Sequence, residues 1–252
     1  MTSNPWQVQI LGWATDLEHL ERHFSSTPQR VVKGEDGNSF LYESDSFTEL
    51  TDSGKVLECA KSELHVLSGV LKLARNSPTP LRAGAVFKFN EASGQKDTYL
   101  HLSDSMTMHA EIGELTVTIT DASGNSTIQA LPPPRTVGIA QLATGDSSVA
   151  KAMRLLASPT HTSWVEMYRI YEVVEDDMGG QHRLAKRGWG SEIDLKRFKH
   201  SANSVAVGGD GARHGKELTV PPPKPMSPDE AAAYLNYVLQ SWLSLKLEER
   251  RP

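Results

Sequence analysis

The chain has a single cysteine, Cys59, in 252 residues. One thiol cannot form an internal disulfide, and no second cysteine stands near it to share a zinc ion, so the sequence predicts a protein of a reducing compartment. It also lacks an apolar run long enough to cross a bilayer, and its first residues have neither the basic head nor the apolar stretch of a signal peptide. We therefore expect a cytoplasmic protein without a membrane partner.

Basic residues are not in excess. The 26 Lys and Arg are outnumbered by 31 Asp and Glu, which gives a formal net charge of −5. A protein that binds nucleic acid over its whole surface usually carries a positive net charge, so a phosphate ligand would have to be bound by a local basic patch. With 38% hydrophobic residues, the chain is long enough to bury a full core, as one large domain or two modest ones.

The hydrophobic pattern of the first half is that of short strands. Turn residues separate these runs, and residues 115–120 alternate strictly between apolar and polar side chains. One long helix interrupts the strands, because apolar residues recur at three- and four-residue spacing over residues 55–74. We expect an antiparallel sheet with this helix on one face. The predicted strands cover residues 6–13, 39–47, 83–89, 98–102, 106–112, 115–120 and 127–131.

After Leu142 the pattern becomes helical. Helices are predicted over residues 147–157, 161–177 and 192–200, and a last one starts near Ser227 with Pro228 in its first turn. Their aromatic residues favour packing as a bundle. The break near residues 143–148 sets the boundary. We predict an α+β protein with an N-terminal antiparallel β-rich domain that contains the long helix, residues 1–145, and a C-terminal helical bundle, residues 146–252.

Two clusters of titratable residues have simple structural interpretations. A short helix near residues 16–24 places His19 and His23 one turn apart, but two imidazoles without a third ligand do not make a metal site, and we expect a surface helix there. The acidic run from Glu172 to Asp177 could hold a divalent cation or share a proton. We interpret it as a solvated helix end, since glycines stop the helix just after it.

The strongest candidate site is the block of residues 197–216. It gathers basic, imidazole, amide and glycine residues between helical patterns, a composition that suits an anion. An arginine can neutralise a phosphate, and a histidine can move a proton near neutral pH. The predicted catalytic residues are His214, Arg213 and Asn203, and the predicted ligand-binding residues are Arg197, His200, Gly215 and Lys216.

The order of features in the C-terminal half resembles that of uncharacterised bacterial proteins with a HEPN-like helical domain. These features are the helix from Trp164, the turn Ala212-Arg213-His214-Gly215 and the helix start over residues 226–231. The resemblance implies a helical bundle that often forms a homodimer. Many members cleave RNA without a metal or cofactor in toxin or phage-defence systems, and others bind nucleotides or act as scaffolds. In that chemistry His214 would activate the ribose hydroxyl or protonate the leaving oxygen, while Arg213 or Arg197 would neutralise the phosphate. Arg213 directly precedes His214, closer than in catalytic members.

Three function classes follow. The first is a HEPN-like protein that binds or processes RNA, or another phosphate ligand, without a metal or cofactor. The second is a non-enzymatic interaction or scaffold protein, in which Arg213 and His214 tie the turn to the acidic helix by a salt bridge and hydrogen bonds. The third is a metal-dependent hydrolase that uses histidines and acidic residues of the C-terminal half. Its candidate ligands are His182, His200 or His214 with Glu172 or Asp176.

Overall fold

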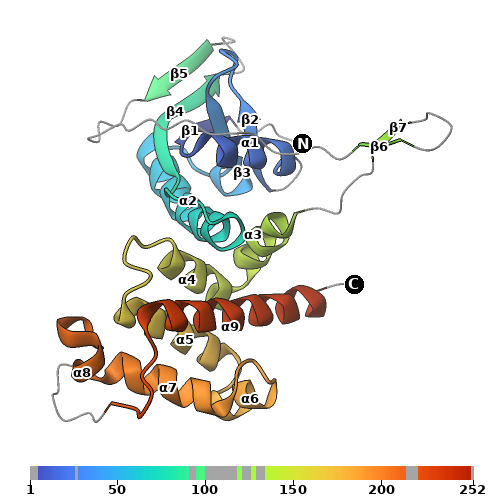
Figure 1. Cartoon of the computed structure of the whole chain (residues 1–252). Coiled ribbons are helices and arrows are strands. Elements are labelled where there is room, and N and C mark those ends of the chain that lie inside the picture. Colours follow the sequence, from blue (N-terminus) through green and yellow to red (C-terminus); the bar gives the residue numbers. More distant parts are fainter. Residues whose placement is uncertain are drawn as a thin grey trace. The chain divides into compact units, whose positions relative to one another are not determined.

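The computed structural model describes residues 5–25, 28–90, 95–99, 118–120, 126–128, 134–213 and 221–250. The chain divides into two compact units, Met1–Gly138 and Ile139–Pro252 (Figure 1). The first holds an antiparallel sheet with helices and the second is helical, which confirms the predicted α+β class. The boundary between the units falls inside helix α3 (Arg135–Gly145). None of the helices that the structure describes is long and apolar enough to span a membrane.

The sheet of the first unit has five strands in the order β2-β3-β1-β4-β5, with all neighbours antiparallel. Helix α1 (Ala14–His23) connects β1 to β2, and helix α2 (Ser53–Arg75) lies between β3 and β4 in the chain. The first four strands therefore follow the β-α-β-β-α-β topology, with β5 added at the free edge of β4. The strands are β1 (Trp6–Leu11), β2 (Gln29–Lys33), β3 (Phe40–Ser44), β4 (Arg82–Asn90) and β5 (Gln95–Tyr99), and β6 (Thr118–Thr120) pairs with β7 (Ser126–Ile128).

Helix α2 packs its apolar stripe on the sheet, as the sequence predicted. It begins where Asp52 accepts a hydrogen bond from the Lys55 amide at 2.9 Å, and it ends at Asn76 in the left-handed conformation. Polar contacts also cross this interface: Glu63 of α2 accepts from the Tyr42 hydroxyl at 2.8 Å and from the Ser44 hydroxyl at 3.1 Å. Burial, together with the Glu63 carboxylate, raises the pKa of Tyr42 well above its usual value.

Some elements of the first unit differ from prediction. Strand β2 was missed because it lies at the sheet edge, where only Val31 of its residues is buried and no alternation is visible. Helix α3 was missed because its Thr, Val and Ile residues are strand formers, a preference that tertiary packing overrides. The strand predicted at 106–112 lies outside the described residues, as do parts of those at 98–102, 115–120 and 127–131.

The predicted surface position of His19 is wrong. This residue is 5% exposed, and its Nε2 atom lies 2.8 Å from Oγ1 of Thr136. Arg75 brings Nη1 to 3.2 Å from Nδ1 of the same ring and donates from Nε to Asp16 at 2.9 Å. Because arginine can only donate, Nδ1 is the acceptor and the neutral ring carries its proton on Nε2. Helical spacing alone cannot show which side of α1 is covered.

The second unit is built from helices α4 (Ser147–Leu156), α5 (Trp164–Asp177), α6 (Gln181–Lys186), α7 (Glu192–Asn203), α8 (Val205–Gly208) and α9 (Pro228–Glu249). Helix α5 packs against α4, α7 and α9. The start of α9 follows its sequence signal, because Ser227 and Glu230 form a reciprocal capping box with Pro228 in the first turn. The sequence predicted α4, α5, α7 and α9, whereas α6 and α8 are too short for a periodic pattern.

Candidate functional site

Arg213 lies against the acidic helix α5. Its Nη2 atom is 2.6 Å from Oε1 of Glu172, and its guanidinium carbon is 4.1 Å from the centre of the Tyr168 ring. Its backbone amide donates to the carbonyl of Ala202 at 2.8 Å, which ties the turn to the end of α7. We call the contacts of Arg213 with Glu172 and Tyr168 the Arg213 clasp. This ion pair is the contact on which the scaffold alternative depends.

Arg197 also makes contacts within the protein. From α7 it donates Nε to the carbonyl of Lys224 at 2.8 Å, and its terminal nitrogens lie 3.4 Å from Asp194 and 3.7 Å from Glu230. These contacts hold the segment before α9 against α7. Both arginines that were predicted to face a phosphate are therefore engaged by carboxylates.

The remaining residues of the block do not converge with Arg213 on one described site. His200 is exposed in the last turn of α7. Asn203 ends that helix, and its Oδ1 atom is buried without a hydrogen-bond partner in the part of the chain that the structure describes. His214, Gly215 and Lys216 lie outside the described residues.

The acidic run of α5 is not a solvated helix end, contrary to the prediction. Glu172 pairs with Arg213, and Glu175 lies 3.3 Å from Nζ of Lys199. Asp177 accepts from the indole nitrogen of Trp242 and from Lys246, each at 2.8 Å. Asp176 is exposed, and the Glu172 side chain is 43% exposed in spite of its partner. The sequence could not show this, because the cationic partners come from other elements of the unit.

Lys246 joins two helix ends of the second unit. Its Nζ atom lies 2.5 Å from Asp146 and 2.8 Å from Asp177, and Asp146 also caps α4 by accepting from the amides of Ser148 and Val149 at 3.0 Å. Burial alone would lower the pKa of Lys246, but the two carboxylates outweigh it and raise this pKa. A lysine held in its charged form by two carboxylates is not a nucleophile or a general base.

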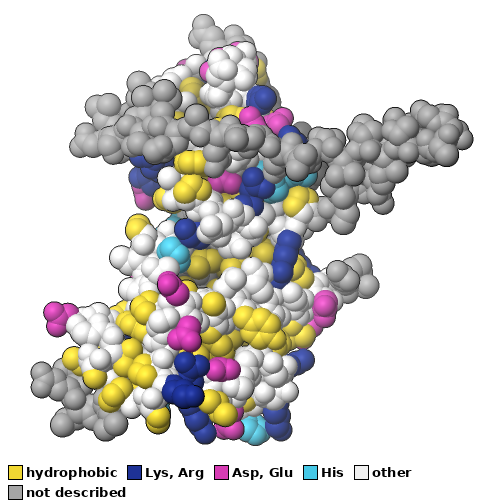
Figure 2. Space-filling model, viewed as in Figure 1, with side chains coloured by type: hydrophobic (Ala, Val, Ile, Leu, Met, Phe, Trp, Pro, Cys, Tyr) yellow, Lys and Arg dark blue, Asp and Glu magenta, His cyan; other side chains and the backbone are white. Residues whose placement is uncertain are grey.

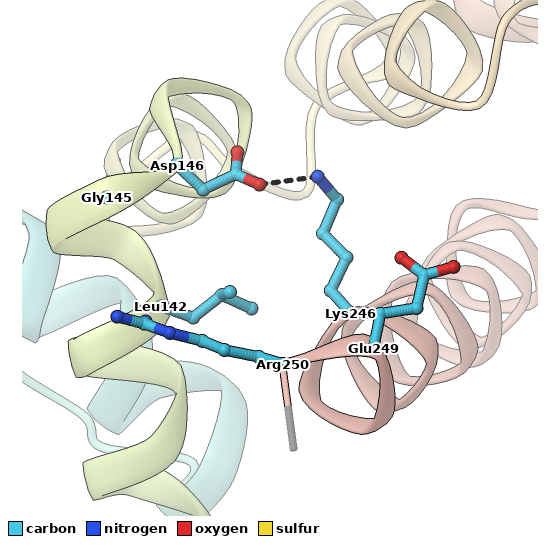
Figure 3. A pocket seen from close by; sticks show the side chains of 6 residues that line it. All are labelled: Leu142, Gly145, Asp146, Lys246, Glu249 and Arg250. Atoms are coloured by element: carbon cyan, nitrogen blue, oxygen red, sulfur yellow. Dashed lines mark hydrogen bonds and ion pairs between the residues drawn. The ribbon is translucent and has the colours of Figure 1, made fainter. Parts of the chain in front are cut away.

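A pocket of about 360 Å³ opens beside Lys246 (Figure 3). It is lined by Leu142, Gly145, Asp146, Lys246, Glu249 and Arg250. The Arg250 side chain extends from the end of α9 toward α3 and donates to the carbonyl of Gln141 at 2.6 Å. Both cations of the lining thus contact other groups of the protein.

The structure brings no metal site together among the residues it describes. No group of three His, Cys, Asp or Glu side chains in these ranges is placed to hold an ion. His182 and His200 are each exposed on different helices, and Glu172 is engaged by Arg213. The described residues therefore lend the metal-dependent hydrolase no support.

A basic surface that the sequence reasoning did not single out lies on α6. We define the basic surface of α6 by the exposed residues His182, Arg183, Lys186 and Arg187. None of these side chains makes a hydrogen bond or ion pair in the part of the chain that the structure describes. Figure 2 shows Lys, Arg and His side chains over α6 and α7 along the lower edge of the view. The signal in the sequence is a basic run bounded by glycines at 179–180 and at 188 and 190.

The turn after α6 has a fixed backbone. Gly188 and Gly190 have φ of +71° and +91°, a region that side chains other than glycine rarely enter. A Cβ atom at Gly190 would lie 2.5 Å from Cε2 of Tyr234, so the backbone passes directly against that ring. Trp189 stands between the two glycines and is partly exposed. On the inner side Leu184, which is 1% exposed, anchors α6.

No protein-family model, curated protein or solved structure that was compared with the chain is similar enough to count as a match. The function therefore rests on the geometry of the chain itself.

Proposed function

We propose that the protein binds RNA through the basic surface of α6, and that it does so without cleaving it. The observation that supports binding is the group of four exposed basic side chains on α6 and its C-cap, none of which is paired with a carboxylate among the residues that the structure describes. Cations that are not neutralised within a protein release counterions from a phosphate backbone when they bind it, and this release provides most of the affinity for nucleic acid. The resemblance to HEPN-like proteins makes RNA the polyanion to test first.

The charge of the two halves favours the second unit as the binding part. Residues 139–252 contain 15 Lys and Arg against 14 Asp and Glu, whereas residues 1–138 contain 11 against 17. A polyanion that approaches the second unit meets a nearly neutral field, in which a local basic surface can act.

The engagement of Arg213 and Arg197 supports binding rather than cleavage. A phosphodiester transition state needs a cation aimed at the developing charge, and both arginines are already directed at carboxylates of their own unit. The same observation favours the second candidate function, an interaction or scaffold protein in which the Arg213 clasp is structural and no RNA is bound.

The test is binding of a short fluorescent RNA by the full chain, measured by anisotropy over a range of salt concentrations. A variant with Arg183→Ala, Lys186→Ala and Arg187→Ala removes three charges from α6. Its matched control, Lys55→Ala with Lys151→Ala and Lys224→Ala, removes three exposed charges elsewhere. We expect the α6 variant to bind about tenfold or more weakly and to lower the slope of log K against log salt by about 2, and the control to change neither much.

Equal loss in both variants, or no binding by the wild type, would overturn the proposed function, and the latter would leave the scaffold candidate. Cleavage is examined on the same samples by denaturing gel, with and without a chelator. If the protein cut RNA in the presence of the chelator and His214→Ala abolished the cutting, the proposed function would have to change from RNA binding to RNA cleavage of the kind found in catalytic HEPN proteins.

A further inference from the structure

The second unit has three tryptophans, and they differ in their surroundings. Trp164 is 6% exposed and Trp242 is fully buried, with its indole nitrogen bonded to Asp177. Trp189 alone of the three is partly exposed. Its indole makes no hydrogen bond or ring contact in the described ranges, although neighbouring aromatic rings of the unit form a contact cluster. Trp189 is therefore the one of these three tryptophans that a ligand can reach from the surface.

The backbone on either side of Trp189 is constrained by contacts within the unit. The amide of Gly190 donates to the carbonyl of Gly188 at 3.0 Å, and Gly190 abuts the ring of Tyr234 on α9. The Tyr234 ring packs in turn on Phe198, with 5.6 Å between the ring centres. Burial, with Asp194 nearby, raises the pKa of Tyr234 to about 12. An aromatic group on a pinned backbone loses little conformational freedom when it binds a partner.

Trp189 is separated from the basic surface of α6 by Gly188 alone. Arg187 and Lys186 precede it by two and three residues, and both are exposed. A cationic track next to an aromatic ring is the combination by which proteins bind single-stranded nucleic acid, because the backbone follows the charges while an unpaired base stacks on the ring. A duplex keeps its bases paired and stacked, so it can use the charges but not the ring.

We propose that the turn after α6 is a binding site for single-stranded RNA, in which Trp189 stacks on an unpaired base while Arg183, Lys186 and Arg187 contact the flanking phosphates. This inference rests on the proposed function and narrows its substrate class. It assigns a specificity-determining role to Trp189. In this site the basic side chains provide affinity for any RNA, whereas stacking on Trp189 favours single strands over duplexes.

The experiment compares a single-stranded RNA with its own duplex as anisotropy probes on the full chain. Trp189→Leu removes the aromatic face while keeping an apolar side chain, and Trp189→Phe keeps an aromatic face at the same position. We expect Trp189→Leu to weaken single-strand binding about five- to a hundredfold, Trp189→Phe to retain most of it, and neither change to alter duplex binding. Thermal melting of both variants monitors the fold.

A second readout reports stacking directly. Titration with single-stranded RNA should quench the tryptophan fluorescence of the wild type, and the quench should be nearly absent in Trp189→Leu, although four other tryptophans remain. Equal affinities of Trp189→Leu and Trp189→Phe, or an equal loss for duplex and single strand, would overturn the stacking site. If the three-charge variant of α6 still lost RNA binding in that case, the proposed function would stand and only this inference would fall.

Discussion

Arg213 and Glu172 join the turn after α8 to helix α5, with 2.6 Å between Nη2 and Oε1. Their side chains are 27% and 43% exposed, so solvent screens the pair and the ion pair itself contributes about 0.5 kcal/mol. The guanidinium also lies over the face of Tyr168, a contact that contributes about 1 kcal/mol. We predict that Arg213→Ala lowers the free energy of unfolding by about 1 to 2 kcal/mol in urea titrations.

Glu172→Gln is the matched control for the Arg213 clasp. It removes the charge of the partner but leaves the contact of Arg213 with Tyr168, so we expect a loss of about 0.5 kcal/mol. If Arg213→Ala unfolded at the same urea midpoint as the wild type, Arg213 would not be structural. It would then remain available for the phosphate role predicted from the sequence.

Lys246 is the next position at which one side chain serves several elements. Its side chain is 15% exposed and neutralises Asp146 and Asp177, whose side chains are 23% and 16% exposed. Replacing it with methionine keeps the aliphatic stem and leaves two carboxylates without a counter-charge. We predict that Lys246→Met destabilises the protein by about 2 kcal/mol, whereas Lys151→Met on exposed α4 surface changes the unfolding midpoint little.

The same network gives a pH dependence of known sign. Burial alone raises the pKa of Asp146, but Lys246 and the amides of α4 outweigh it and hold this pKa below its usual 3.8. A carboxylate whose pKa is lower in the folded state stabilises the folded protein at pH values above the unfolded-state pKa. That contribution is lost as the pH falls through the folded-state pKa. Because the pKa of Lys246 is raised, its charge stabilises the folded protein below pH 10.5. This contribution is lost as the pH rises through the folded-state pKa.

The free-energy difference between wild type and Lys246→Met should therefore be constant through neutral pH. It should narrow below about pH 4 and again above about pH 10.5. Urea midpoints of both proteins across this range measure it. A difference that stays the same at every pH would show that the three charges do not act together.

His19 provides a test of the first unit by spectroscopy. Its Nδ1 atom faces a donor of Arg75 at 3.2 Å and its Nε2 atom faces Thr136 at 2.8 Å. We predict that the neutral ring carries its proton on Nε2, because arginine has no acceptor and Nδ1 must accept. Nitrogen NMR of the imidazole distinguishes the two tautomers and the cation. A proton on Nδ1 would contradict the described contact with Arg75.

The sequence predicted the helices and strands of the fold better than it predicted which of them lie side by side. Periodic patterns located α2, α4, α5, α7 and α9, because each carries an apolar stripe over several turns. The edge strand β2 and the one-and-a-half turns of α6 carry too few apolar residues for a pattern to appear. An element could be predicted from the sequence when it was long enough and buried enough to show a periodic apolar pattern.

The candidate site was less predictable than the fold. Composition identified a basic and glycine-rich block, but a charge in a sequence does not reveal whether a carboxylate from another helix neutralises it. Arg213 and Arg197 have such partners, whereas Arg183 and Lys186 have none within the described part of the chain. The distinction between a structural and a binding arginine lies in tertiary contacts, which no spacing along one chain encodes.

Gly190 tests the turn on which the stacking site depends. Alanine at this position would have to adopt a φ of +91° and would place Cβ 2.5 Å from the Tyr234 ring. Gly180 is the matched control, since its φ is +103° and a Cβ atom there would meet nothing within 4 Å. The positive φ alone costs alanine about 1 to 2 kcal/mol at either position, and overpacking against a ring adds about 1 to 3 kcal/mol.

We therefore predict that Gly190→Ala destabilises the protein more than Gly180→Ala by about 1 to 3 kcal/mol in urea titrations. Because relief of the clash would move the turn, Gly190→Ala should also weaken single-strand binding while Gly180→Ala preserves it. If both substitutions cost the same, Tyr234 yields to the new methyl group, and α9 does not fix the turn. Trp189 would then lack the rigid support that makes stacking on it favourable.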